Sequence, residues 1–195
     1  MRKQDKTGQR GTKLRKGSIQ PSITAMLEAL GYELKGELKD TPARVSALWT
    51  QTLLAGEGKD PAQILQRRMK TKKSDPVLVT NIGMHLVCPH HLSVAFGQAH
   101  IAYLPADHII GFGVLSHLVE ACCAKLTLQE NAAQDICSAL VNLLPAKAAV
   151  CSIKAAHPCH RLLHPRAHQS HAITWAEAGT KSAAKELRAL LKSSL

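Results

Sequence analysis

The sequence predicts an α+β fold in which an antiparallel sheet carries helices on one face. Helix-type apolar spacing fills the first third, strand-type alternation follows from Pro76, and then come two helical stripes and two further strand-like runs. Helices and strands segregated in this way are typical of α+β domains rather than of alternating α/β folds. A chain of 195 residues can bury one substantial core, and with only 3% aromatic residues this core must be mostly aliphatic.

The N-terminal segment, residues 1–18, reads as a disordered basic tail. Residues 1–17 hold seven Lys or Arg and one acid, and so carry six of the eleven net positive charges. A polar, Gly-containing arm of this kind is most simply solubilising, and weak RNA or polyphosphate binding is the alternative. Because the remainder carries only five net charges, we do not expect a nucleic-acid partner.

Residues 19–70 are predicted to form a helical region. Apolar side chains between Ile23 and Leu30 lie on one helical face, and Gly31 supplies a stop. Asp40-Thr41-Pro42 is typical of a helix start, and the stripe that follows ends near Gly56. A short helix is expected from Pro61.

Residues 71–178 are predicted to form the sheet domain. A first strand starts at Val77, and a longer one spans about 92–103, with Gly97 indicating a bulge or the close approach of another backbone. Two helices follow, one near residues 114–122 and one from Gln129 to Pro145. A buried strand from Ala148 is expected to run on to Cys159, with another strand at about 167–175.

The C-terminal segment, residues 179–195, is predicted to be a helix. The apolar residues Ala184, Leu187, Leu190 and Leu191 form a stripe within it. This helix either packs back on the domain or docks on a neighbour.

The most informative stretch is Val87-Cys88-Pro89-His90-His91-Leu92, taken together with His157-Pro158-Cys159. Cysteines and histidines in two tight clusters are a better metal site than a disulfide framework in a chain without a secretory signal. Cys88, His91 and Cys159 can hold zinc and leave a fourth position for water, as catalytic zinc sites do. The alternative is a closed structural site with His90 or His160 as the fourth ligand.

The distribution of apolar residues along the chain indicates where in the cell the protein is located. No run of eighteen apolar residues is present, and no apolar segment follows the basic N-terminus. We therefore predict a cytoplasmic protein without a membrane segment, whose six cysteines stay reduced or bind metal.

Six fragments lie in order along residues 40–159. They are Asp40-Thr41-Pro42-x-Arg44-Val45, Cys88-x-His90-His91, Ala102-Tyr103-x-Pro105, Ile110-Gly111, Leu128-Gln129-Glu130 and His157-x-Cys159. In these fragments, and in nearly the same spacing between them, the sequence resembles the GTP cyclohydrolase I family over most of residues 21–177. Each fragment alone is weak, but six in register are specific.

The resemblance implies the tunnelling fold, a four-stranded antiparallel sheet with two helices on it. It also implies a homo-oligomer, a decamer of two stacked pentameric rings with active sites between subunits. In the family, the positions of Cys88, His91 and Cys159 hold Zn²⁺, those of His90 and His157 act on protons, and those of Gln129 and Glu130 hold guanine. The reaction implied is zinc-assisted opening of the purine imidazole ring, with release of formate and formation of dihydroneopterin triphosphate.

The sequence departs from the family at the residues that bind the triphosphate. Gly113 and Val114 replace Ser-Lys, and arginines are replaced by His117, Leu163 and Thr80. Candidate substitutes as phosphate contacts are Arg161, Arg166, His117, His160, His164 and His168.

Three hypotheses therefore stay open. The first is a zinc-dependent GTP cyclohydrolase, and the second is a related enzyme acting on GMP, guanosine or a pterin. The third is a purine- or pterin-binding subunit without turnover.

Overall fold

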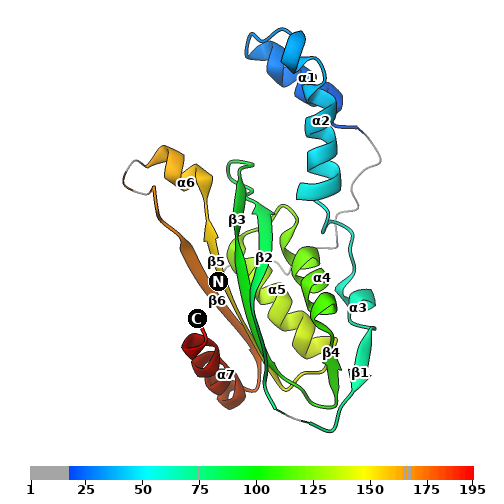
Figure 1. The fold of residues 1–195 in the computed structure, drawn as a ribbon, viewed down its shortest axis with the longest axis vertical. Coiled ribbons are helices and arrows are strands. Elements are labelled where there is room, and N and C mark those ends of the chain that lie inside the picture. Colours follow the sequence, from blue (N-terminus) through cyan, green and yellow to red (C-terminus); the bar gives the residue numbers. More distant parts are fainter. Residues whose placement is uncertain (1–17, 74, 165, 167) are drawn as a thin grey trace, which may run out of the picture.

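The computed structural model describes residues 18–73, 75–164, 166 and 168–195 (Figure 1). The helices are α1 (Gln20–Ala29), α2 (Thr41–Leu48), α3 (Pro61–Ile64), α4 (Phe112–Cys123), α5 (Gln129–Asn142), α6 (Pro158–Leu163) and α7 (Lys181–Ser193), with a 3-10 turn η1 (Gly36–Leu38) and a π-helical turn η2 (Trp49–Leu53). The strands are β1 (Arg68–Lys70), β2 (Val77–Val87), β3 (Val94–Leu104), β4 (His108–Ile110), β5 (Ala148–Ala156) and β6 (Ala172–Gly179). The predicted basic tail lies almost entirely outside the described residues.

The main sheet has four strands in the order β2-β3-β5-β6, and every neighbouring pair is antiparallel. This confirms the predicted α+β class and the tunnelling-fold arrangement. A second sheet pairs β1 with β4, so that Arg68 lies opposite Ile110. The sequence did not predict this small sheet, because strands of three residues carry too little alternation to be recognised.

Both faces of the main sheet are covered, but by different helices. Helices α4 and α5 lie on one face, where Leu118, Ile136 and Leu140 pack with inward residues of the strands in the larger core. Helix α7 lies on the opposite face, where Leu187 and Leu191 pack with the smaller core that includes Val150. The division follows from the two-residue period of strands, because successive side chains point to opposite faces. The prediction of two helices on one face is confirmed. The sequence left two positions open for the C-terminal helix, and α7 packs back on its own chain.

Two predicted strand boundaries are wrong. Strand β5 ends at Ala156, and Cys159 lies in α6 rather than on a continuing strand. Pro158 at the first helical position explains the change, since its fixed φ favours a helix start and it cannot donate to a sheet ladder. Strand β6 begins at Ala172, later than predicted, and ends at Gly179.

Helices α1 and α2 extend beyond the end of the main sheet (Figure 1). None of the residues of α1 is buried, and the apolar side chains of Met26 in this helix and of Leu30 directly after it are more than half exposed. Across the described ranges, no helix combines the length and the apolar character that crossing a bilayer requires.

Gly97 is required by close packing between strands, one of the two roles that the sequence predicted. It lies opposite Ala155 in a regular part of the β3–β5 ladder, and a Cβ at this position would stand 2.6 Å from the Ala155 Cα. We expect Gly97→Ala to lower the free energy of unfolding by about 2–3 kcal/mol, because the strands would have to separate. Chemical denaturation measures this change. Gly83→Ala in β2 is the matched control, since its Cβ would meet nothing within 4 Å; an equal loss in both variants would contradict this explanation.

Candidate functional site

The loop between β2 and β3 presents the first cluster of candidate residues. The Cys88 N–H donates to the Ser93 carbonyl at 2.9 Å, and the Leu92 N–H donates to the Cys88 carbonyl at 2.9 Å. Leu92 has φ of 53°, a left-handed conformation that closes the turn. The loop therefore holds Cys88 buried at its base and His91 exposed at its tip.

The segment from Lys125 to Leu128 attaches α5 to the end of β2. The Val87 N–H donates to the Lys125 carbonyl at 3.1 Å, and the Thr127 N–H donates to the Val87 carbonyl at 3.2 Å. Because α5 begins at Gln129, these two bonds bring the first turn of that helix beside Cys88.

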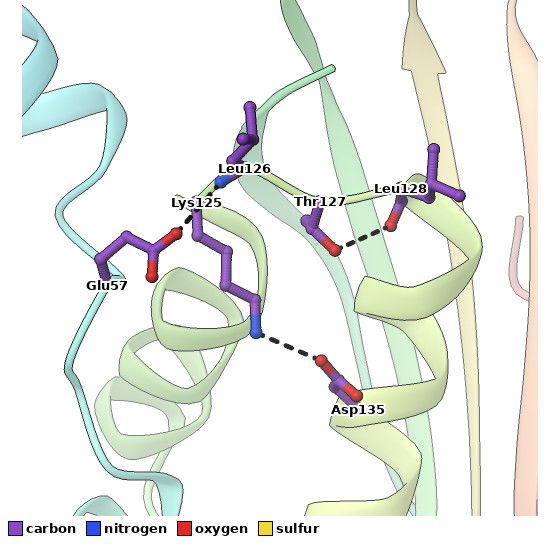
Figure 2. Close-up of polar contacts among 6 residues, drawn as sticks. All are labelled: Glu57, Lys125, Leu126, Thr127, Leu128 and Asp135. Carbon is purple, nitrogen blue, oxygen red and sulfur yellow. Dashed lines mark hydrogen bonds and ion pairs between the residues drawn. The ribbon is translucent and has the colours of Figure 1, made fainter. Parts of the chain in front are cut away.

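Side chains reinforce this attachment (Figure 2). The Glu57 carboxylate accepts from the Leu126 N–H at 3.4 Å, and the Lys125 ammonium lies 3.2 Å from the Asp135 carboxylate on α5. The Thr127 hydroxyl donates to the Leu128 carbonyl at 3.4 Å. The start of α5 is thus held from the N-terminal region, from β2 and from its own second turn.

The second cluster of candidate residues, His157 and Cys159, lies where β5 ends and α6 begins. His157 is the last residue before α6, and Cys159 lies in its first turn. The candidate ligand atoms of Cys88, His91 and Cys159 all lie within 4.8 Å of one another. The structure therefore brings together, from the β2–β3 loop and from α6 about seventy residues later, the three residues that the sequence assigned to metal.

These three residues fit a zinc ion. Two cysteine sulfurs and one imidazole nitrogen are a donor set that Zn²⁺ favours, with bonds of about 2.0–2.3 Å. Tetrahedral ligands at those bond lengths stand about 3.5–3.8 Å apart, so the observed cluster needs only a small contraction. Three protein ligands leave one tetrahedral position open.

A cavity of about 460 Å³ lies beside this cluster. Both predicted proton carriers, His90 and His157, line it, and so do Gln129 and Glu130. The other lining residues are Leu86, Cys88, His91, Thr127, Leu128, Cys159, His160, Leu163, His164, Ser170, His171 and Ala172.

A buried amide connects His157 to the sheet. The His157 Nε2 and the Gln129 Oε1 lie 2.8 Å apart, and the Gln129 Nε2 lies 2.9 Å from the Ile153 carbonyl oxygen. Burial lowers the pKa of His157, with a smaller lowering from His160, while the Glu130 carboxylate opposes both. The imidazole is therefore biased toward its neutral form, in which one ring nitrogen is a free acceptor.

His90 and Glu130 are both exposed. The Nδ1 of His90 lies 3.8 Å from the Cys88 sulfur. Glu130 lies in the first turn of α5, where a negative charge is favoured by the helix dipole. Both side chains are open to a ligand entering the cavity.

Comparison with known proteins decides the family. A family model described as GTP cyclohydrolase I matches residues 19–195. The chain belongs to the GTP cyclohydrolase I family. GTP cyclohydrolase 1 of Ralstonia nicotianae is 34% identical over 159 residues, covering 81% of this chain and 76% of that protein. GTP cyclohydrolase 1 of Streptococcus pyogenes serotype M18 is 34% identical over 168 residues, covering 85% and 86%.

Among solved structures, the apo form of the archaeosine synthase QueF-Like aligns with a TM-score of 0.47 and 16% sequence identity. The alignment covers 56% of this chain and 98% of that chain.

The candidate phosphate contacts do not lie close together, unlike the three candidate metal ligands. In this member of the GTP cyclohydrolase I family, Arg161 donates twice to the Ser170 carbonyl, at 2.8 and 3.1 Å, and does not line the cavity. His117 lies 3.6 Å from Glu120 and lines a separate hollow with Lys59 and Arg67. Arg166 is exposed. Of the substitutes suggested by the sequence, His160 and His164 line the cavity.

Sequence reasoning missed some of the lining residues. Thr127 and Ser170 line the cavity, but neither belongs to a motif that the GTP cyclohydrolase I resemblance drew upon. Thr127 was detectable in principle, because it comes two residues before Gln129. Ser170 lies between α6 and β6, and no local sequence pattern predicts that it reaches the cavity.

Proposed function

We propose that this protein is a zinc-dependent hydrolase of the GTP cyclohydrolase I type, which opens the imidazole ring of a guanine nucleotide, releases formate and yields a dihydroneopterin phosphate. One observation carries the proposal: Cys88, His91 and Cys159 form a metal-compatible cluster beside a cavity lined by two further histidines and a carboxylate. When bound, Zn²⁺ would supply a water of lowered pKa and a Lewis acid beside the purine.

The two histidines divide the proton transfers. Burial lowers the pKa of His157 and so favours its neutral form, in which the ring can accept a proton and return it as the purine ring opens. His90 is exposed, with its Nδ1 3.8 Å from the Cys88 sulfur, and can donate a proton to a nitrogen of the purine imidazole ring as that ring opens. Neither ring belongs to the Cys88–His91–Cys159 set.

Glu130 is proposed to recognise the base. A carboxylate accepts hydrogen bonds from guanine N1–H and the exocyclic amine, a pattern of donors that adenine does not offer. Because Glu130 is the exposed second residue of α5 and lines the cavity, its carboxylate is accessible to a ligand there. The same residue raises the pKa of His157 and so links base recognition to the proton carrier.

We propose that the working form is a homo-oligomer, a decamer of two stacked pentameric rings, in the cytoplasm. Strands β2 and β6 are the outer strands of the four-stranded sheet and leave edges available for pairing. The exposed apolar side chains of Met26 in α1 and of Leu30 directly after it supply a second surface for association. The described cysteines are free thiols, which suits a reducing compartment.

A second candidate substrate class has its own support. Gly113 and Val114 replace a family serine and lysine, and Arg161 is bound to Ser170 rather than directed into the cavity. Four negative charges require strong cationic ligands. A less phosphorylated purine, such as GMP or guanosine, or a pterin, is therefore the alternative to GTP.

Formate release over GTP, GMP, guanosine and neopterin tests the proposal with zinc-loaded protein. Formate from GTP alone supports the first substrate class, and formate from the others supports the second. Ligand binding without any formate would overturn the enzymatic proposal and leave a purine- or pterin-binding subunit. Zinc content is measured on the same samples, so that a loss of metal is not mistaken for the wrong substrate.

A further inference from the structure

Gln129 is the most completely enclosed polar side chain of the site, at 2% exposure. Its Nε2 lies 2.9 Å from the Ile153 carbonyl, 3.2 Å from the Ala172 carbonyl and 3.1 Å from the Thr174 hydroxyl. A primary amide has two N–H donors, so these three oxygens occupy its donor side completely. The amide therefore joins α5 to both β5 and β6.

These contacts fix which way the amide points. If the amide were rotated by 180°, its oxygen would face two backbone carbonyl oxygens, which cannot donate. Both carbonyls would then lose a donor in a buried place, at a cost of about 1–3 kcal/mol each. The Oε1 must therefore face His157, and that orientation follows from the surrounding chain.

An acceptor facing Nε2 determines the tautomer of His157. Because the Gln129 oxygen can only accept, the His157 Nε2 at 2.8 Å must carry the hydrogen. The neutral ring then has its lone pair at Nδ1. A hydrogen bond to one ring nitrogen commonly sets the role of the other in this way.

We propose that Gln129 is a positioning residue, which holds His157 as the Nε2–H tautomer so that Nδ1 is the nitrogen that exchanges a proton with the substrate. The inference rests on the proposed function in giving His157 that task. The proton enters and leaves at Nδ1, while the Nε2–H stays donated to Gln129 throughout. Direct contact between Gln129 and guanine, which the family resemblance implies, is the competing role.

The tautomer is measured without any reaction. In zinc-loaded protein labelled with ¹⁵N-histidine, magic-angle-spinning NMR distinguishes a protonated ring nitrogen from a bare one, and His157→Gln identifies the signals. At a pH where His157 is neutral, we expect Nε2 to be protonated and Nδ1 bare. The opposite assignment in the wild-type protein would overturn the proposal, whether or not any purine is turned over.

Gln129→Met removes the acceptor while keeping the side chain's length. We expect a mixture of the two His157 tautomers and a fall in kcat of about 10- to 100-fold with KM unchanged, as for other partners that orient a functional histidine. Gln134→Met, an exposed glutamine of the same helix, is the control and should leave both measurements unchanged. A raised KM with unchanged kcat and tautomer would instead assign Gln129 to guanine binding. If the variant fails to fold, the wild-type spectrum still decides.

Discussion

Replacing Cys159 with alanine is expected to remove stoichiometric zinc and to abolish formate release. Cys159 supplies one of the three candidate ligand atoms among the described residues of the cluster, and it lies on α6, whereas Cys88 and His91 come from the β2–β3 loop. Without Cys159, both remaining candidate ligands come from a single turn, and the metal is no longer held from two separate parts of the chain. Metal analysis and formate release on the same preparation measure both effects.

The matched control is another cysteine outside the cluster. Cys137 is buried in the main core, and its sulfur lies 3.4 Å from the Ala176 carbonyl. Cys137→Ala should keep zinc and activity while losing about 1 kcal/mol of stability from the small cavity it creates. If Cys159→Ala kept a full equivalent of zinc, the assignment of this cluster would be wrong.

Replacing His157 with alanine is expected to separate metal binding from proton transfer. The ring is hydrogen-bonded to Gln129 and is not one of the three candidate ligands. Zinc content should therefore stay at the wild-type level while kcat falls about 10²- to 10⁴-fold, the range for loss of a general acid–base group. Steady-state formate release with parallel metal analysis provides the measurement.

His108→Gln controls for the loss of a histidine elsewhere. His108 lies on β4 and contacts the neighbouring Asp107, away from the cavity. It should retain zinc and wild-type kcat. Retained activity in His157→Ala would rule out His157 as the proton carrier. Loss of zinc from that variant would instead indicate that His157 is a metal ligand.

Some of the fold and site was predictable because the signals are local. Local patterns reflect burial on one face of one element, as in the strand alternation around Val77 and Ile101 and in the helical stripe from Ile136 to Leu144. The candidate metal ligands could be proposed for a different reason, because thiols and imidazoles in tight clusters have few other uses in a reduced chain. The six fragments shared with the family then placed those clusters in one fold.

Other features depend on contacts between distant parts of the chain. The β1–β4 pair joins residues about forty positions apart, and neither strand is long enough to show a pattern. Cys159 was assigned to a strand because the apolar run before it reads as one, and Pro158 then redirects the chain into α6. The sequence predicts Arg161 as a phosphate contact, and only the structure shows that its guanidinium donates to the Ser170 carbonyl.

The sequence by itself determined the family, the α+β class and the identity of the three candidate metal ligands, since residue type and spacing carry that information. The tertiary structure decided that these ligands lie within 4.8 Å of one another and that Gln129 faces His157 with its oxygen. The physical reason is that an amide's orientation depends on the carbonyls around it. Those carbonyls come from β5 and β6, which reach Gln129 only when the sheet has formed.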